Sequence, residues 1–538
     1  MSLQIQKWSL PMKPETQSPF SEKDKVQIRD HGLLEEQVMA QLDLFLNPPA
    51  PVRLLRPCKV GDGIKRLDPS HAAELAQIHL REAAKGRCMK FVPASGSASR
   101  MFSGLLALRK DGVVSLEEVK ERAREGDPNS VQAVEFLGQL ERFPFYSQLK
   151  DSMARAGLDL KALLAQERIG ELLEALLSPL QLGYEDLPKA LVPFHSYGEE
   201  VRTSLEEHLV EAASYVADAR GFCRIHFTVS PPHLERFQQA LENARKRYEE
   251  LLGVRFQIQV SIQDPSTDTL AVDMENRPFR DKEGRLLFRP GGHGALLRNL
   301  QDTGGEIVFI KNIDNVPHER FMEESLFWKR VLGGCLIRYQ EEIAHIIRRL
   351  ASPRPEERFI RKAMEFAQGV LCLGLPSRKE LGSRLEACAR LRQWLDRPLR
   401  VCAMVENQAE PGGGPFWVST LPGECALQIV ESVEVDLSDE AQRSIWLSST
   451  HFNPVDMVCM LRDAQGNPFD LRLFADTSRV LITKKSSGGR ELKALEHPGL
   501  WNGGMARWNT IFVEVPVTTF QPVKTVNDLL RPGHQPSP

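Results

Sequence analysis

A loop of small residues that ends in an arginine is the first segment of this sequence with the means to handle phosphate. The loop, Ala94-Ser95-Gly96-Ser97-Ala98-Ser99-Arg100, lies between the short apolar run Phe91-Val92-Pro93 and a predicted helix. Small side chains let backbone N–H groups approach a phosphate closely, and a helix N-terminus adds to the anion-binding concavity. Arg100 is expected to reach the β- and γ-phosphates of a triphosphate, although such a loop also occurs as a simple tight turn. The loop residues predicted to bind are Ala94, Ser95, Gly96 and Ser97.

A lysine and an aspartate add matching chemistry further along the chain. Pro188 fixes the backbone before Lys189, whose compact charge suits a phosphate. Asp314 follows the predicted strand 306–310, and ligands of open α/β sheets lie at the carboxyl ends of strands. Mg²⁺ takes one or two protein carboxylates together with phosphate oxygens, so Asp314 is a candidate metal ligand. The alternatives are a solvated turn for Lys189 and a helix N-cap for Asp314.

The first two segments together resemble the bipartite signature of sugar-phosphate nucleotidyltransferases. That signature is a small-residue loop with an arginine, followed by Pro-Lys-x-Leu-x-Pro, here Pro188-Lys189-Ala190-Leu191-Val192-Pro193. In most of the family about a dozen residues separate the halves, whereas here the predicted helices of 115–178 lie between them. Ser95 and Ala98 also stand where the family has glycines.

Two later groups of motifs resemble the UDP-sugar pyrophosphorylases in particular. They are Arg289-Pro290-Gly291-Gly292-His293-Gly294 with Lys311-Asn312-Ile313-Asp314-Asn315, and the C-terminal runs 508–513 and 520–530. The resemblance implies that the glycine segment holds the base, that Asp314 binds magnesium and that Lys524 contacts phosphate. It further implies that UTP is the preferred triphosphate. The substrate-binding residues implied by the resemblance are Gln263, Gly292, His293, Gly294, Glu431 and Asn509.

Two segments of unusual composition lie outside these motifs. Together with the rest, the runs 450–456 and 498–504 make the chain similar to an uncharacterised bacterial family of unknown function. His451 and Asp456 in the first run are candidates for a metal or acid–base site. Their alternative role is a hydrogen-bonded structural corner.

The alternation of strand-like and helical segments predicts an α/β fold. Strand patterns at 224–229, 255–262 and 306–310 alternate with helical ones at 200–219 and 232–251. Such alternation favours a parallel sheet covered on both faces. With the resemblance, we expect a three-layer nucleotide-diphospho-sugar transferase (Rossmann-like) core with helical insertions and a C-terminal β-containing region, where further strands are predicted at 400–405, 426–434, 470–473 and 510–515.

The predicted division of the chain has a core between helical additions. We expect an N-terminal helical appendage at 1–88 and a nucleotidyltransferase core at 89–318 with a helical insertion at about 115–180. A helical block at 319–399 follows, then the remainder of the core with the β-containing region at 400–532, and a disordered tail at 533–538.

Composition restricts the partners and the compartment. The 538 residues are 42% hydrophobic and 26% charged with a formal net charge of -3, which is typical of an ordinary globular protein and argues against nucleic-acid binding. The nine cysteines include no C-x-x-C pair. No run approaches the roughly 18 apolar residues that span a bilayer. We therefore expect a cytoplasmic protein without a membrane partner.

The predicted reaction joins a sugar 1-phosphate to a nucleoside triphosphate and releases pyrophosphate, with Mg²⁺ as cofactor. The resemblance gives Arg100, Lys189 and Lys524 the catalytic roles. A glycosyltransferase of the same fold is one alternative, but it would have no triphosphate tail for Arg100 and Lys189 to hold. A non-catalytic nucleotide-sugar binding protein is the other. The sugar and the oligomeric state stay open.

Overall fold

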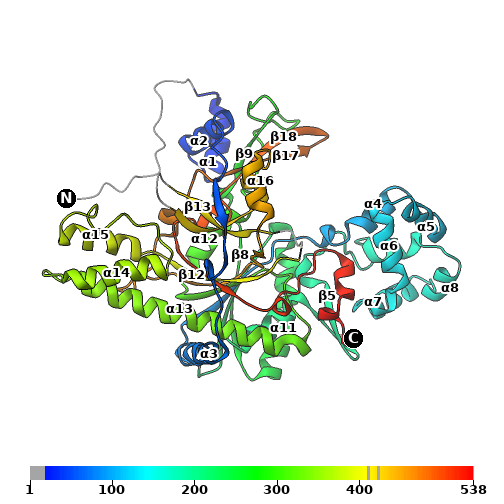
Figure 1. The fold of residues 1–538 in the computed structure, drawn as a ribbon. Coiled ribbons are helices and arrows are strands. Elements are labelled where there is room, and N and C mark those ends of the chain that lie inside the picture. The colour runs from blue at the N-terminus through cyan, green and yellow to red at the C-terminus, as the bar shows by residue number, and fades with distance from the viewer. Residues whose placement is uncertain (1–17, 409–411, 421–424, 537–538) are drawn as a thin grey trace.

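A sheet of ten strands organises the molecule (Figure 1). The computed structural model describes residues 18–408, 412–420 and 425–536. Within the sheet β16 and β15 run antiparallel to their neighbours, and the other pairs are parallel. In spatial order the strands are β2 (Lys59–Val60), β3 (Gly63–Lys65), β19 (Asn509–Glu514), β12 (Leu399–Glu406), β16 (Asp456–Met460), β11 (Ile307–Lys311), β4 (Cys88–Pro93), β7 (Phe222–Val229) and β8 (Arg255–Ile262), with β15 (His451–Phe452) paired to β12.

Both faces of this sheet are buried. Along β11, Ile307 and Phe309 belong to one hydrophobic cluster, while Val308 and Ile310 belong to another on the opposite face. Strands covered on both sides read as continuous apolar runs, which is the pattern of β11 and of β12. The predicted α/β class is therefore confirmed.

One face is covered by long helices. α13 lies on β12 and β16 and packs closely along α3, where a Cβ on Gly334 would stand 1.8 Å from the Leu75 carbonyl oxygen. The helices on this side are α3 (Pro69–Ala83), α10 (Ser204–Ala213), α11 (Leu234–Leu252), α13 (Met322–Leu350), α14 (Glu357–Gly369) and α15 (Arg384–Leu395). The helical block predicted at 319–399 contributes α13, α14 and α15 to this layer of the core.

The opposite face is covered by α12 and a small sheet. Leu296 and Leu300 of α12 share a hydrophobic cluster with Trp417 and Leu427 of that sheet. These elements are α12 (Leu296–Asp302), β1 (Leu54–Pro57), β13 (Gly414–Ser419) and β14 (Cys425–Val430), with α16 (Glu440–Leu447) beside β1.

The N-terminal segment is not a helical appendage as predicted. Residues 54–83 supply β1, two strands of the main sheet and α3, so they belong to the core. Only α1 (Glu22–Asp30) and α2 (Glu35–Leu46) lie to one side, where they pack on a four-stranded sheet. That sheet consists of β10 (Phe288–Arg289), β9 (Thr269–Val272), β18 (Arg490–Glu496) and β17 (Leu481–Ser487).

A group of helices after β4 has a hydrophobic core of its own (Figure 1, cyan). Ser115 caps one of these helices by accepting a hydrogen bond from the Glu118 N–H at 3.2 Å. Their core also includes Val523, Val526 and Leu529 from the C-terminal segment. The helices are α4 (Ser103–Lys110), α5 (Leu116–Arg124), α6 (Pro128–Gly138), α7 (Tyr146–Arg155), α8 (Leu160–Ala165) and α9 (Gly170–Leu177).

Three local predictions were wrong. The helix expected at 200–219 is preceded by a strand, β6 (Glu200–Thr203), which pairs with β5 (Pro193–Tyr197). The strand expected at 470–473 is a short 3₁₀ helix, Leu471–Phe474. Residues 533–535 of the predicted tail are buried, and His534 lies in the 3₁₀ helix Pro532–His534, whereas residues 537–538 lie outside the described residues.

Candidate functional site

Two lysines meet on one oxygen of Asp314. The ammonium groups of Lys189 and Lys524 each lie 2.9 Å from Oδ2 of Asp314. Asp314 and Lys189 are each 8% exposed, whereas 43% of the Lys524 side chain is exposed. Oδ1 of Asp314 is buried and has no hydrogen-bond partner in the part of the chain that the structure describes. Lys189 and Lys524 lie 125 and 210 positions from Asp314 in the sequence, and the three residues thus form one charged centre.

The helical insertion separates the two halves of the phosphate motif in sequence but not in space. The Lys189 N–H donates to the Gly96 carbonyl at 3.0 Å, and the Ala98 N–H donates to the Leu187 carbonyl at 2.9 Å. This bridge holds Lys189 against the loop that follows β4. Asp314 follows β11, which is the parallel neighbour of β4, so both segments leave the same edge of the sheet.

The C-terminal segment is fastened on both sides of Lys524. The Val523 N–H donates to the Asp314 carbonyl at 3.0 Å, and the Val526 N–H donates to the Met101 carbonyl at 3.0 Å. Asp528 accepts hydrogen bonds from the Lys524 and Thr525 N–H groups, each at 2.7 Å. Lys524 is therefore placed beside the loop of residues 94–100 rather than across the molecule.

The loop itself presents unused backbone donors. Ser95 and Gly96 are exposed, and the N–H groups of Ser95, Gly96 and Ser97 make no hydrogen bond within the described residues. A Cβ on Gly96 would meet nothing within 4 Å. Consecutive free N–H groups form the kind of concavity that binds anions. Ala94 was wrongly included in the predicted set, because it is buried and its N–H donates to the Thr228 carbonyl at 2.8 Å.

Arg100 adds a cation to this edge of the sheet. Its side chain is exposed, and no hydrogen bond or ion pair engages it among residues 18–408, 412–420 and 425–536. Lys189 and Lys524 are paired with the carboxylate of Asp314, and Asp528 lies beside the same centre. The exposed guanidinium of Arg100 is thus a cation of this loop that is available to receive an anion.

The charge of Asp314 is maintained against burial. Burial raises the pKa of this carboxyl, but the ammonium groups of Lys189 and Lys524 outweigh that effect and hold the pKa below its usual value. Burial lowers the pKa of Lys189, and the Asp314 carboxylate opposes this shift. No three His, Cys, Asp or Glu side chains in the described chain are grouped to hold a metal ion. The free Oδ1 of Asp314 fits a magnesium ion that arrives with phosphate oxygens, since such an ion needs few protein ligands.

The glycine segment expected to hold the base is packed against the chain. A Cβ on Gly291 would lie 2.6 Å from the Thr267 carbonyl oxygen, and one on Gly294 would lie 2.3 Å from that of Pro498. Gly292 has φ +72° and faces Glu496. These glycines are required by the close approach of residues 496–499, so their presence needs no ligand.

His293 and Glu431, both predicted to bind substrate, lie together around Trp501. The His293 and Trp501 rings stack with centroids 4.1 Å apart, and the Trp501 indole N–H donates to Glu431 Oε1 at 3.1 Å. Side chains of His293 and Glu431 are each 27% exposed. A carboxylate beside a stacked ring is chemistry that suits a polar ring such as a sugar.

Gln263 and Asn509 lie at opposite edges of the sheet. Gln263 follows the carboxyl end of β8, where it donates to Asp268 Oδ1 at 3.3 Å. Asn509 is fully buried at the amino end of β19 and donates to the Leu395 carbonyl at 2.9 Å. The prediction that Asn509 binds substrate was wrong, because its amide serves the junction of β19 and α15.

A pocket beside Gln263 offers a polar group that sequence reasoning missed. Asn299 of α12 donates to Ser261 Oγ and to the Ile262 carbonyl, while its buried Oδ1 has no partner. Nothing in the sequence distinguishes Asn299 from other helical polar residues. The pocket residues are His226, Leu234, Gln238, Val260, Ser261, Ile262, Asp264, Pro265, Arg298, Asn299 and Asp302.

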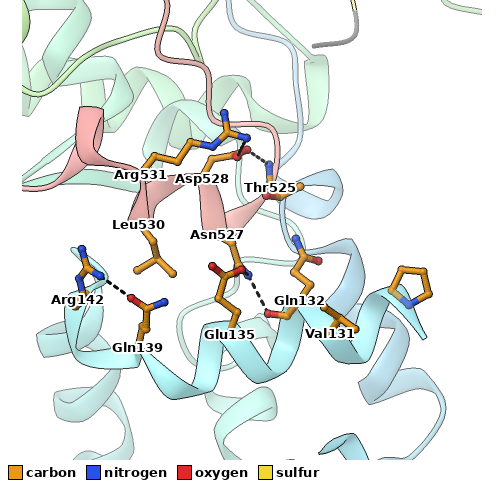
Figure 2. A pocket seen from close by; sticks show the side chains of 11 residues that line it. Val131, Gln132, Glu135, Gln139, Arg142, Thr525, Asn527, Asp528, Leu530 and Arg531 are labelled. Carbon is orange, nitrogen blue, oxygen red and sulfur yellow. Dashed lines mark hydrogen bonds and ion pairs between the residues drawn. The ribbon is translucent and has the colours of Figure 1, made fainter. Parts of the chain in front are cut away.

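A second pocket lies next to Lys524, between α6 and the C-terminal segment (Figure 2). Thr525 and Asp528, the acceptor for the Lys524 N–H, line it on one side, and Glu135 lines it on the other. The role of Asp528 was also missed, although Thr525-x-x-Asp528 is a readable capping pattern.

His451 and Asp456 do not form a common site. Asp456 is buried in an ion pair with Lys329, whereas His451 contacts Glu514 at 3.4 Å. Asn453 between them donates to the Ala403 carbonyl and caps the Val455 N–H. The structural-corner interpretation describes this segment.

Several solved structures are similar to this chain. The chain is similar to UDP-N-acetylglucosamine pyrophosphorylase from Trypanosoma brucei (12% identity, 95% of this chain and 79% of that chain, TM-score 0.48). It is also similar to UDP-glucose pyrophosphorylase from Leishmania major (13%, 94% and 77%, 0.43) and to UDP-glucose phosphorylase from Trypanosoma brucei (12%, 94% and 77%, 0.42).

The family is shown by sequence. Residues 21–535 match the family described as "Domain of unknown function (DUF4301)", and the chain belongs to that family. No curated protein matches. Among the described residues no helix combines the length and apolar character needed to cross a membrane.

Proposed function

We propose that this protein is a nucleotidyltransferase that forms a nucleotide sugar and pyrophosphate from a nucleoside triphosphate and a sugar 1-phosphate. The observation that carries the proposal is the convergence of Lys189 and Lys524 on Asp314, beside a loop with three free N–H groups. A triphosphate tail needs several positive groups at one place, and this edge of the sheet supplies them. A finished nucleotide sugar has no such tail, which argues for this reaction over glycosyl transfer.

In the proposed reaction a phosphate oxygen of the sugar 1-phosphate attacks the α-phosphorus of the triphosphate. One P–O bond forms there, and the bond to the β-phosphate oxygen breaks, so pyrophosphate leaves with the electron pair. No protein nucleophile is required, because positioning and charge neutralisation supply the rate enhancement. Arg100 and the N–H groups of Ser95 and Gly96 would hold the leaving pyrophosphate. Lys189 and Lys524 would neutralise the phosphates that meet at Asp314.

Magnesium would be held by Asp314 Oδ1, the carboxylate atom that the lysines leave free. When bound, the ion supplies charge neutralisation to the phosphate oxygens. Lys189 and Lys524 disfavour a permanently bound cation, so we propose that the metal arrives with the triphosphate. The triphosphate would then compete with Asp314 for both ammonium groups.

We propose UTP as the preferred triphosphate. The ends of neighbouring strands lie about 4.8 Å apart, so the end of β8 lies roughly 10 Å from the end of β4, about the span of a nucleoside. Gln263 and the unpaired Oδ1 of Asn299 lie at that end of β8. Uracil presents one N–H between two carbonyls, and an amide oxygen paired with an amide N–H matches that edge. The glycines 291–294 are packed against other segments of the chain and would not contact the base.

The sugar would lie near Glu431, His293 and Trp501. The carboxylate of Glu431 can accept hydrogen bonds from sugar hydroxyls, and the Trp501 ring already fixes its position.

The proposal is tested by measuring pyrophosphate release with four nucleoside triphosphates and a panel of sugar 1-phosphates, with and without Mg²⁺. We expect release that requires Mg²⁺ and is fastest with UTP. Binding of a nucleotide sugar without release in any combination would favour a non-catalytic binding protein instead. Preference for another triphosphate would overturn only the uridine assignment.

A further inference from the structure

A chain of buried side chains ties the C-terminus to α10. His534 is 1% exposed, and its Nδ1 lies 2.9 Å from Nε2 of His195. The two imidazole rings stack with centroids 5.2 Å apart and planes 17° apart. Nδ1 of His195 in turn lies 2.8 Å from Oε1 of Glu207, which also accepts a hydrogen bond from the Tyr197 hydroxyl at 2.7 Å. His195 and Glu207 are fully buried, and none of these groups has a role in the reaction proposed above.

The segment held in this way is the one that carries Lys524. Its beginning is fixed by the Gln521 N–H, which donates to Asn315 Oδ1 at 3.0 Å. Its end is fixed by the Gly533 carbonyl, which accepts from the His318 N–H at 2.9 Å. Both anchors lie on the stretch that follows Asp314. The segment therefore loops away from Asp314 and returns to the same stretch, with Lys524 near its start.

α10 binds the Asp314 stretch as well. His208 Nε2 lies 3.2 Å from the Ile313 carbonyl oxygen, and the Ser204 hydroxyl donates to the same oxygen. Ser204, Glu207 and His208 are three and four residues apart, so they lie on one face of the helix. One helix face thus holds both the residue before Asp314 and, through His195 and His534, the segment of Lys524.

We propose that His534, acting through His195 and Glu207, is a positioning residue that keeps Lys524 on Asp314. The ion pair of Lys524 contributes little to holding its segment, because 43% of this side chain is exposed and solvent screens the pair. Hydrogen bonds in a water-free interior are stronger, and a chain of them strengthens each member. The importance of this placement for catalysis rests on the proposed function, whereas the placement itself does not.

Two amides at position 534 give a matched test. The side-chain amide nitrogen of His534→Asn can occupy the place of imidazole Nδ1 and donate to His195, whereas the longer His534→Gln carries its amide where Nε2 stood. Thr518→Ala is the control, since it removes an exposed hydroxyl bond to Glu324 just before the segment begins. Hydrogen–deuterium exchange of the full chain would follow the amides of Val523 and Val526, which donate to Asp314 and Met101. Binding of inorganic pyrophosphate would be measured on the same proteins.

We expect His534→Gln to speed exchange at Val523 and Val526 by a factor on the order of ten, with His534→Asn and Thr518→Ala close to the wild type. Pyrophosphate affinity should fall in His534→Gln alone. Equal exchange at these amides in folded His534→Gln and His534→Asn would overturn the proposal. If exchange changes as expected but the wild type binds no pyrophosphate, the positioning role of His534 stands and the proposed function fails. If His534→Gln does not fold, His534→Asn must protect both amides as the wild type does, and faster exchange there would also overturn the proposal.

Discussion

The candidate site has a phosphate side and a base side, and the structure explains the sequence motifs of the two sides in different ways. On the phosphate side, Lys189 and Lys524 reach Asp314 from distant parts of the chain, and free N–H groups lie beside them. On the base side, the glycines 291–294 are explained by close packing against residues 496–499. A cluster of like charges is costly unless a ligand or a counter-ion is present, so it points to a site. A glycine is explained equally well by the close approach of another segment of the same chain.

The largest effect is expected at Asp314. Asp314→Ala should lower turnover by a factor on the order of 10² or more, as for loss of one preorganised electrostatic group. It should also cost about 3–5 kcal/mol of stability, because Lys189 would be left buried without a partner. Turnover and urea unfolding would check both effects. The loss of stability follows from the buried ion pair between Lys189 and Asp314.

Asp314→Asn is the matched variant for this position, because it keeps the size and removes the charge. Turnover close to that of the wild type in folded Asp314→Asn protein would show that the carboxylate is not needed.

Substitutions of the two lysines should affect stability and pyrophosphate binding to different extents. Lys524→Ala is expected to change the free energy of unfolding by less than about 0.5 kcal/mol, as for an exposed residue. It should weaken pyrophosphate binding roughly ten-fold or more, in line with a charge-assisted hydrogen bond of about 1.5–3 kcal/mol. Lys189→Ala should lower both the free energy of unfolding and the affinity for pyrophosphate, since Lys189 is buried.

Calorimetric titration and thermal unfolding of both lysine variants would measure the separation. Lys85→Ala, which removes an exposed lysine paired with Glu82, is the control. Pyrophosphate affinities that are the same for Lys524→Ala and Lys85→Ala would argue against a phosphate site at Asp314.

Two glycine substitutions sharpen the comparison between the halves. Gly96→Ala should leave the melting temperature unchanged, because its Cβ meets nothing within 4 Å, yet it should weaken pyrophosphate binding by crowding the free N–H groups. Gly294→Ala should lower stability, since its Cβ would lie 2.3 Å from the Pro498 carbonyl oxygen. The opposite pattern, with binding lost only in a stable Gly294→Ala protein, would return the glycine segment to the ligand site.

The smallest effect expected is a pH dependence at Glu207. Burial raises the pKa of this carboxyl to about 7, although the Tyr197 hydrogen bond and Arg202 oppose the shift. A raised pKa contributes stability that is complete below the unfolded value, near 4.5, and is lost as pH rises through about 7. Glu207→Gln cannot ionise, so its free energy of unfolding should increase relative to that of the wild type between pH 5 and pH 8. A difference that does not change with pH would contradict the assignment.

A structural element could be predicted from the sequence where its cause lies in residues that are close together in the chain. The strand 255–262 was predicted with the bounds that β8 has, because its pattern and turns are local. The short β3 and the antiparallel β16 were not predicted, since they form by pairing with strands that are distant in the sequence, β19 for β3 and β11 and β12 for β16.

The same distinction holds within the site. The Pro188-Lys189 pair and Asp314 could be found from residue type and place in the α/β pattern. Asn509 was wrongly chosen, because its role depends on which end of β19 it occupies. The burial of His534 could not be foreseen, since its partner His195 lies 339 residues away.

The central claim is that Arg100, Lys189 and Lys524 form one polyphosphate site with Asp314. Equilibrium binding of inorganic pyrophosphate tests it most directly, because it needs neither the right sugar nor the right base. We predict that the wild type binds pyrophosphate, that Arg100→Ala and Lys524→Ala each bind it more weakly without loss of stability, and that Lys85→Ala binds as the wild type does. A wild type that does not bind pyrophosphate, or affinities that are equal in all four proteins, would contradict the account.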